Sequence, residues 1–191
     1  LSGTYAAALV AKETYSYWPI SVIDSQNISI GLGILLQETV RLAEAGLGRE
    51  EIVERITAMR EKIHVVFVLE TLEYLQKGGR IGKAQAFMGT LLKFKPLLQI
   101  ADGEVAPVAR VRSRAKALEA VQEYLLSQVA GRGSQVRLAL TQALAADEAK
   151  VLGDKLAASF GTRGFHVAAL GPVIGVHVGP GTIGVGVYGG D

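Results

Sequence analysis

The chain has 191 residues, of which 49% are hydrophobic and 20% are charged, and this balance supports a packed core and argues against disorder. Its 20 Lys and Arg residues nearly equal its 18 Asp and Glu residues, so a nucleic-acid binder that neutralises many phosphates is not expected. Cysteine is absent, which excludes disulfide scaffolds, thiolate metal sites and cysteine nucleophiles and fits a cytoplasmic protein. No run approaches the roughly 20 apolar residues that cross a bilayer, so no integral membrane association is expected.

The first 62 residues are predicted to be mainly helical. Apolar residues recur there at helical spacing, and Glu50 and Glu51 fall in the first turn of the third helix, where the helix dipole favours acidic groups. The segment 20–25 is predicted to be a short strand that ends in a turn. The predicted helices cover residues 4–12, 29–45 and 49–62.

The middle of the chain opens with a near-continuous apolar run that predicts a buried strand. Further on, the pair Asp102-Gly103 lies between two apolar runs and predicts a β-hairpin. Pro96 is expected to close a helix, because the residue before proline resists helical geometry, and Ser113 is a candidate N-cap. The predicted elements are strands over 64–69, 97–101 and 104–111 and helices over 71–76, 82–94 and 114–130.

The last third continues the alternation of strands and helices. Asp147 is expected to cap a helix that stops at Gly161, and the Gly-rich segment 173–188 predicts strands joined by tight loops. The remaining predicted elements are strands over 136–141 and 165–170 and a helix over 147–160. The alternation and the hairpin together predict an α/β fold with a mixed, partly antiparallel sheet.

Three polar segments are candidates for binding chemistry. Ser2-Gly3-Thr4 places hydroxyls at the start of a predicted helix, where unpaired N–H groups attract carboxylates and phosphates, and an ordinary helix cap is the alternative. In the segment 77–83, three glycines allow close backbone approach and Arg80 can fork onto an anion, and a helix end followed by a helix start is the alternative. His177 can donate to an anion, or it can be a satisfied core residue.

Several motifs of catalysis are missing from the sequence. It contains no Gly-x-Ser-x-Gly elbow and no His-Glu-x-x-His, and Gly31-Leu32-Gly33 lacks the third glycine of a dinucleotide-binding loop. The histidines have no ligand-type spacing, so no metal site is expected. The residues therefore indicate anion binding and offer no clear nucleophile.

Taken together, these motifs resemble the DegV family of bacterial fatty-acid-binding proteins. The segment from Leu72 to Gly82 is the most specific match, and the closing His177-Val178-Gly179-Pro180-Gly181 adds to it. The matches occur in family order over nearly the whole chain. The other matching segments are Ser2 to Tyr5, Val22 to Ser25, Lys95-Pro96, Asp102 to Val105, and Gly171 to Val176.

The resemblance implies a two-domain fold with a lipid tunnel between the domains. Residues 1–62 would be the remainder of a Rossmann-like N-terminal domain, and residues 63–191 the C-terminal lipid-binding domain, with a composition shift near Lys62 at the boundary. The implied ligand is a long-chain fatty acid, and the implied partner is a fatty acid kinase that makes an acyl phosphate for phospholipid synthesis. No catalysis and no cofactor are implied.

The resemblance also assigns roles to residues. Ser2 matches the family serine that hydrogen-bonds the carboxylate, His177 matches a histidine near the head group, and Arg80 matches a family arginine. Gly3 and Thr4 complete the ligand-binding set of Ser2, Gly3, Thr4, Arg80 and His177. Candidate tunnel walls, for which plain core is the alternative, are Phe67, Leu69, Phe87, Leu91 and Phe94.

The chain departs from the family pattern at its start. The family's opening Thr-Asp-Ser strand and its Thr-Ser loop are absent, so we expect the chain to begin partway through its own binding site at Leu1. Two other functions remain open at this point. One is a phosphate-ligand or regulatory binding module at Gly78-Gly79-Arg80, and the other is an enzyme acting at the same pocket.

Overall fold

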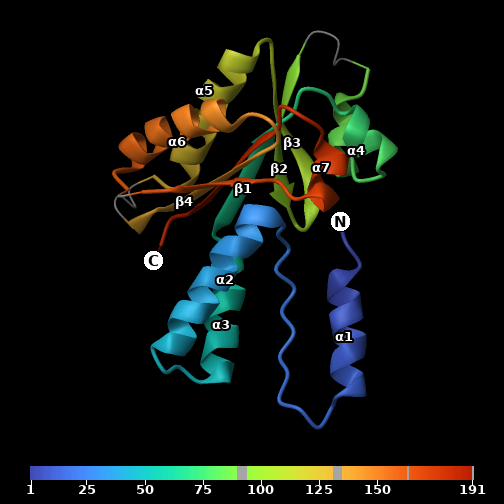
Figure 1. The fold of residues 1–191 in the computed structure, drawn as a ribbon, viewed down its shortest axis with the longest axis vertical. Helices are drawn as coiled ribbons and strands as arrows, with labels where there is room; N and C mark the ends of the chain where they lie inside the picture. The colour runs from blue at the N-terminus through green and yellow to red at the C-terminus, as the bar shows by residue number, and fades with distance from the viewer. Residues whose placement is uncertain (90–93, 131–134, 163, 191) are drawn as a thin grey trace.

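A mixed sheet with helices on both faces forms the body of the protein (Figure 1). The computed structural model describes residues 1–89, 94–130, 135–162 and 164–190. Across the sheet the strand order is β3-β2-β1-β6-β4-β5, with β4 and β5 parallel and every other neighbouring pair antiparallel. The strands are β1 (Ile63–Val68), β2 (Lys95–Ala101), β3 (Glu104–Val111), β4 (Arg137–Gln142), β5 (His166–Ala169) and β6 (Ile183–Tyr188). The predicted α/β class with a mixed sheet is confirmed.

The helices divide between the two faces of the sheet. Figure 1 shows α5 and α6 on one face and α4 and α7 on the other, and α2 and α3 extend from the face of α7 beyond the edge of the sheet. A short 3-10 helix, η1, follows α4. The bounds are α1 (Thr4–Thr14), α2 (Ser29–Glu44), α3 (Arg49–Arg60), α4 (Glu73–Lys77), η1 (Gly82–Phe87), α5 (Arg114–Gln128), α6 (Ala146–Phe160) and α7 (Pro172–Val178).

Strand β6 separates two apolar cores because its residues alternate in size. Ile183, Val185 and Val187 pack into the core under α5 and α6. On the opposite face Gly186 lets the start of α2 approach, since a Cβ built there would lie 3.1 Å from Cγ1 of Ile30. Because successive side chains of a strand point to opposite faces, the large residues of β6 fill the core on one face, and its glycines leave space for a helix on the other.

The elements with local signals in the sequence form as predicted. Asp102 and Gly103 have φ of 53° and 73°, which is the two-residue turn with positive φ that hairpins favour. The Ser113 side chain accepts a hydrogen bond from the N–H of Lys116 at 3.3 Å and caps α5. Gly161 ends α6 in the left-handed conformation, as expected.

Three predictions before residue 150 are wrong in part. The segment 20–25 forms no strand, and Arg60 Nη1 donates to the carbonyl of Asp24 at 2.7 Å. The helix expected over 82–94 is η1, which ends at Phe87 because Met88 is extended, and residues 90–93 lie outside the described residues. Asp147 was expected to cap α6, but it lies inside the first turn of that helix. The residue at the cap position is Ala145, whose N–H donates to the side-chain oxygen of Gln142 at 2.9 Å.

The largest correction concerns the chain after Gly171. Strands joined by loops were expected over 173–188, yet the first part of this segment is helix α7. Pro172 occupies the first helical position, where its missing N–H is not needed and its fixed φ favours a helix. Gly179, with φ of 76°, ends the helix before β6 begins. The β-branched residues of this segment indicated a strand, but Gly171-Pro172 favours a helix start and decides the local structure.

An ion-pair cluster ties α2 to the sheet. The carboxylate of Glu38 accepts from Arg41 at 2.6 Å and pairs with Arg137 of β4 at 2.5 Å. The hydrogen bond from Arg41, and then that from Arg137, hold the pKa of the Glu38 carboxyl below its usual value, although burial opposes this shift.

Within the described ranges, no helix has the length and the apolar character needed to span a membrane.

Two glycines of α2 offer a matched test of this packing. We expect Gly31→Ala to lower the free energy of unfolding by about 1–3 kcal/mol, because a Cβ there would overlap Oδ1 of Asn27 and lie 2.7 Å from Cγ2 of the buried Val65. Gly33→Ala should raise it by about 0.5–1 kcal/mol, because a Cβ built there meets no atom within 4 Å apart from its chain neighbours and the backbone of its own helix. Urea unfolding of both variants measures the difference, and equal effects would contradict the packing of α2 on β1.

Candidate functional site

Helix α7 carries residues of both the apolar part and the polar part of the candidate site. Ile174 and Val178 line an apolar pocket against the sheet. His177, on the same helix, contacts the end of α4. The contact is so close that a Cβ built on Gly78 would overlap the Nδ1 atom of His177. A glycine is therefore required at position 78 for the imidazole to lie where it does.

The apolar pocket lies between α7, the start of α2 and the central strands. Phe67 of β1, Gly184 of β6 and Ile30 of α2 are among its lining residues. The Thr182 hydroxyl at its edge donates to backbone carbonyls of α7 and the following turn, at 3.0 Å from Val178 O and 2.8 Å from Gly179 O. The cavity volume is about 30 Å³, so its walls are nearly in contact.

The expected tunnel walls are only partly in this pocket. Phe67 lines it, whereas Leu69 is fully buried in the core beside it. Phe87 packs against the same core, and the guanidinium of Arg110 lies 5.1 Å from its ring centre. Phe94 is half-buried, and Leu91 lies outside the described residues.

Arg80 joins the start of the chain to α4. Its Nε donates to the carbonyl of Leu1 at 3.3 Å, and its Nη1 donates to the carbonyl of Gly78 at 3.0 Å. The amino group of Leu1 lies 3.5 Å from the carbonyl of Gly103 in the β2–β3 turn. Residues that are about 80 and 100 positions apart in the sequence thus meet at one place.

Ser2 and Thr4 stand exposed at the start of α1. Their hydroxyl oxygens are 2.7 Å apart, and Ser2 Oγ also accepts from the N–H of Thr4 at 3.2 Å. Gly3 occupies the N-cap position, so the cap itself has no side-chain bond. The Ser2 hydroxyl therefore contributes to the helix start and also remains open to solvent.

The structure places the predicted site residues along one path of contacts. Ser2 follows Leu1, which bonds Arg80; Arg80 bonds Gly78, and Gly78 contacts His177. His177 Nδ1 is buried and has no hydrogen-bond partner in the described part of the chain. A buried polar atom without a partner is costly, and Gly78 covers this nitrogen, so a ligand group can reach it only if the imidazole moves.

Larger hollows on the surface have a different character. One of about 750 Å³ between α2, α3 and the sheet contains the Glu38 ion pairs, and one of about 440 Å³ contains Arg114 and Glu148, which pair at 2.6 Å. Paired charges line both, so neither suits an apolar chain. Over the ranges that the structure describes, no cluster of three or more His, Asp or Glu side chains is placed to hold a metal ion.

Sequence reasoning missed Gly78 as the contact of His177 and missed Ile174 and Val178 as pocket residues. The contact joins residues about 100 positions apart and has no local signal. The pocket residues follow from the helical periodicity of α7, and the Gly171-Pro172 start signal was the one local indication of that helix.

Comparison with known proteins identifies the family of this chain. The family model described as "Uncharacterised protein, DegV family" matches residues 1–189. The chain belongs to the DegV family. A DegV domain-containing protein of Streptomyces coelicolor is 37% identical over 97% of this chain and 65% of its own length. The chain spans about two thirds of the length of such relatives.

Solved structures of fatty-acid-binding proteins share the fold. A fatty-acid-binding DegV protein of Thermus thermophilus has a TM-score of 0.91 at 34% identity, over 98% of this chain and 66% of its own. A stearic-acid-binding protein of Eubacterium ventriosum has a TM-score of 0.87 at 26% identity, again over 98% and 66%.

The contact between Gly78 and His177 can be tested directly. Gly78→Ala should displace the imidazole, because the added methyl group overlaps its Nδ1. The ring-nitrogen resonances of His177, one of three histidines in the chain, should shift. Gly175→Ala in the same helix is the control, since a Cβ built there meets no atom within 4 Å apart from its chain neighbours and the backbone of its own helix. Unchanged His177 resonances in Gly78→Ala would refute the contact.

Proposed function

We propose that this DegV protein binds a long-chain fatty acid. The acyl chain would lie in the apolar pocket under α7, and the carboxylate would lie near Ser2, Thr4, Arg80 and His177. The observation that carries the proposal is the unpartnered, buried Nδ1 of His177, on a helix whose neighbouring residues Ile174 and Val178 line an apolar cavity. The fatty-acid-binding DegV relatives support the same ligand class.

The energetics require both halves of such a site. Burial of an acyl chain is favourable by roughly 0.8 kcal/mol per methylene. The carboxylate that enters with it must be hydrogen-bonded, or its desolvation offsets much of that gain. The exposed hydroxyls of Ser2 and Thr4 and the guanidinium of Arg80 are donors suited to this task.

Specific hydrogen bonds disfavour the phosphate-binding alternative. The N–H groups of Gly78, Gly79 and Arg80 donate to carbonyls within α4, at 2.9 Å, 3.0 Å and 2.9 Å. A phosphate-cradling loop needs such groups to point at the ligand. In this protein the same glycines end α4 and bring its backbone against His177.

We further propose a role for the protein as a carrier without catalysis of its own. It would present the fatty acid to a fatty acid kinase, as the family resemblance implies. Residues 1–62 and 63–191 would be the parts of two domains, with the ligand at their junction near Leu1, Arg80 and His177.

Native mass spectrometry of freshly purified protein tests the ligand class. We expect a copurified mass that matches a fatty acid, because an acyl chain of many methylenes dissociates slowly from an apolar site. Extraction with organic solvent should remove that mass. A nucleotide or a sugar phosphate in its place, with no lipid, would refute the carrier proposal.

Changing Ser2→Ala tests the head-group site. We expect fatty-acid affinity to fall by about 1–3 kcal/mol, or roughly 5- to 150-fold, because a buried carboxylate loses a donor. The control is Ser127→Ala, which removes an exposed hydroxyl bonded to the carbonyl of Tyr124 in α5. Equal affinity of both variants, measured by titration of delipidated protein, would remove Ser2 from the site.

A further inference from the structure

Helices α4 and α7 contact each other through two pairs, each made of a ring and a glycine. Figure 1 shows the two helices next to each other on one face of the sheet. In one pair, the imidazole of His177 in α7 lies against Gly78 at the end of α4. In the other pair, the ring of Tyr74 in α4 lies against Gly179, which ends α7, and a Cβ built on Gly179 would overlap that ring. Each helix thus presents a ring to a glycine of the other.

The two contacts lie on one face of α4. Tyr74 and Gly78 are four residues apart, so they lie one above the other on the helix surface. The N–H of Gly78 donates to the carbonyl of Tyr74 at 2.9 Å, which fixes their separation. On α7, the partners His177 and Gly179 are two residues apart. A single contact would leave the end of α7 free to pivot, whereas two contacts one helical turn apart also fix its rotation.

The backbone at Gly179 is held in two ways. Its carbonyl accepts a hydrogen bond from the buried Thr182 hydroxyl at 2.8 Å. The ring of Tyr74 fills the space into which a side chain of residue 179 would project. The φ of Gly179 is 76°, a conformation that also favours glycine. Close packing transmits a shift of one group to its neighbours, so a change at Tyr74 reaches His177 through two residues of backbone.

The imidazole of His177 has little freedom in this arrangement. Nδ1 and Cε1 are its atoms nearest to the position of a Cβ on Gly78, so that edge of the ring faces α4. We propose that Tyr74 is a positioning residue for His177, because its ring fixes the end of α7 and thereby the place of the imidazole. The consequence for fatty-acid affinity rests on the proposed function, whereas the steric coupling of Tyr74 to His177 does not.

The contact of Tyr74 with Gly179 needs a ring and not a hydroxyl group. The atoms of Tyr74 nearest to the built Cβ are Cδ2, Cε2 and Cγ, which are all ring carbons. Tyr74→Phe should therefore retain the contact, and Tyr74→Ala should remove it. Glu73→Ala is the matched control, because it removes the exposed ion pair with Lys77, at 2.6 Å, from the same helix and leaves both pairs of ring and glycine unchanged.

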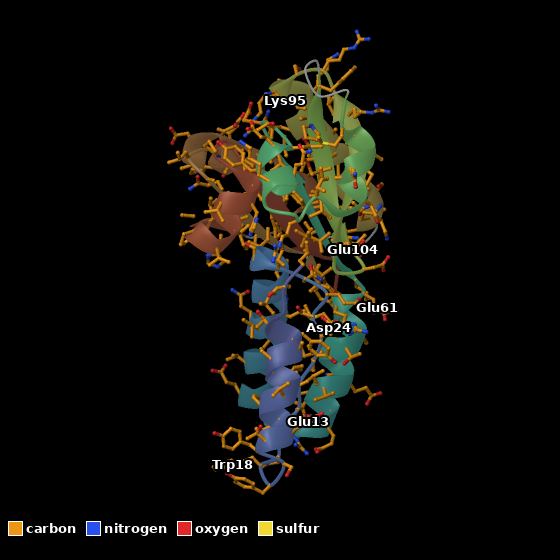
Figure 2. The ribbon with its side chains drawn as sticks, turned by 90° about the vertical axis from the view of Figure 1, so that its right-hand side faces the viewer. Glu13, Trp18, Asp24, Glu61, Lys95 and Glu104 are labelled. Carbon is orange, nitrogen blue, oxygen red and sulfur yellow. The ribbon has the colours of Figure 1, made fainter. Side chains whose placement is uncertain are left out.

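The ring-nitrogen resonances of His177 test the steric coupling in the absence of ligand. We expect them to shift in Tyr74→Ala and to remain unchanged in Tyr74→Phe and Glu73→Ala. Tryptophan fluorescence would not report this contact, because Trp18 is the only tryptophan of the chain and lies at the end of the molecule opposite to Lys95 of the sheet (Figure 2). Unchanged His177 resonances in Tyr74→Ala would overturn the proposal.

Comparison of an acid with its ester tests the consequence for binding. In titrations of delipidated protein, Tyr74→Ala should bind stearic acid about tenfold more weakly, which is the size of effect that loss of a hydrogen bond to a charged group has. Its affinity for methyl stearate, which has the same acyl chain and no carboxylate, should be unchanged. Tyr74→Phe should bind both ligands as the unchanged protein does. Equal losses for the acid and the ester would give Tyr74 a purely structural role and overturn the proposal.

A double variant separates this proposal from the proposed function. If Tyr74 acts through His177, then Tyr74→Ala should lower the affinity for stearic acid no further in a protein that already carries His177→Ala. Additive losses would contradict the positioning role. If His177→Ala alone leaves that affinity unchanged, the head-group role of His177 in the proposed function fails. The His177 resonances of Tyr74→Ala then still decide whether Tyr74 positions the ring.

Discussion

The absence of side chains at Gly184 and Gly186 is the constraint on which the arrangement of β6, α2 and the apolar pocket depends. A Cβ at Gly184 would lie 2.9 Å from Cγ2 of Thr141, and one at Gly186 would lie 3.1 Å from Ile30. The strand is buried on both faces, so any added side chain must displace a neighbour. The same strand thus supplies bulk to the core under α5 and α6 and leaves room for the pocket.

Sequence reasoning succeeded where a local signal decides the structure. The Asp102-Gly103 turn, the Ser113 cap and the Gly161 helix end each depend on residues within one turn of chain. It failed for residues 20–25, because a strand exists only when another strand pairs with it, and none of the described strands pairs with this segment. It failed for α7 because two local signals disagree there: the β-branched residues favour a strand, and Gly171-Pro172 favours a helix start.

In the candidate site, too, the sequence indicated individual residues but not the contacts between them. Ser2, Arg80 and His177 were proposed from motif types and their order along the chain, and the structure links them through Leu1 and Gly78. No pattern of spacing predicts that link, because it depends on how α4 and α7 pack. The role of Gly78 is steric, and a steric requirement is visible only when both surfaces are known.

The narrow pocket and the short helix over it are physically related. An acyl chain needs more than about 30 Å³, so binding as proposed requires one wall to move. Helix α2 has 16 residues and is held to β4 by the Glu38–Arg137 pair. Helix α7 has seven residues, and so short a helix depends on packing for its stability. We infer that α7 is the wall that yields. His177 lies on that helix, so a movement that admits the acyl chain also moves the head-group residue, and recognition of the two ends of the ligand would be coupled through one turn of backbone.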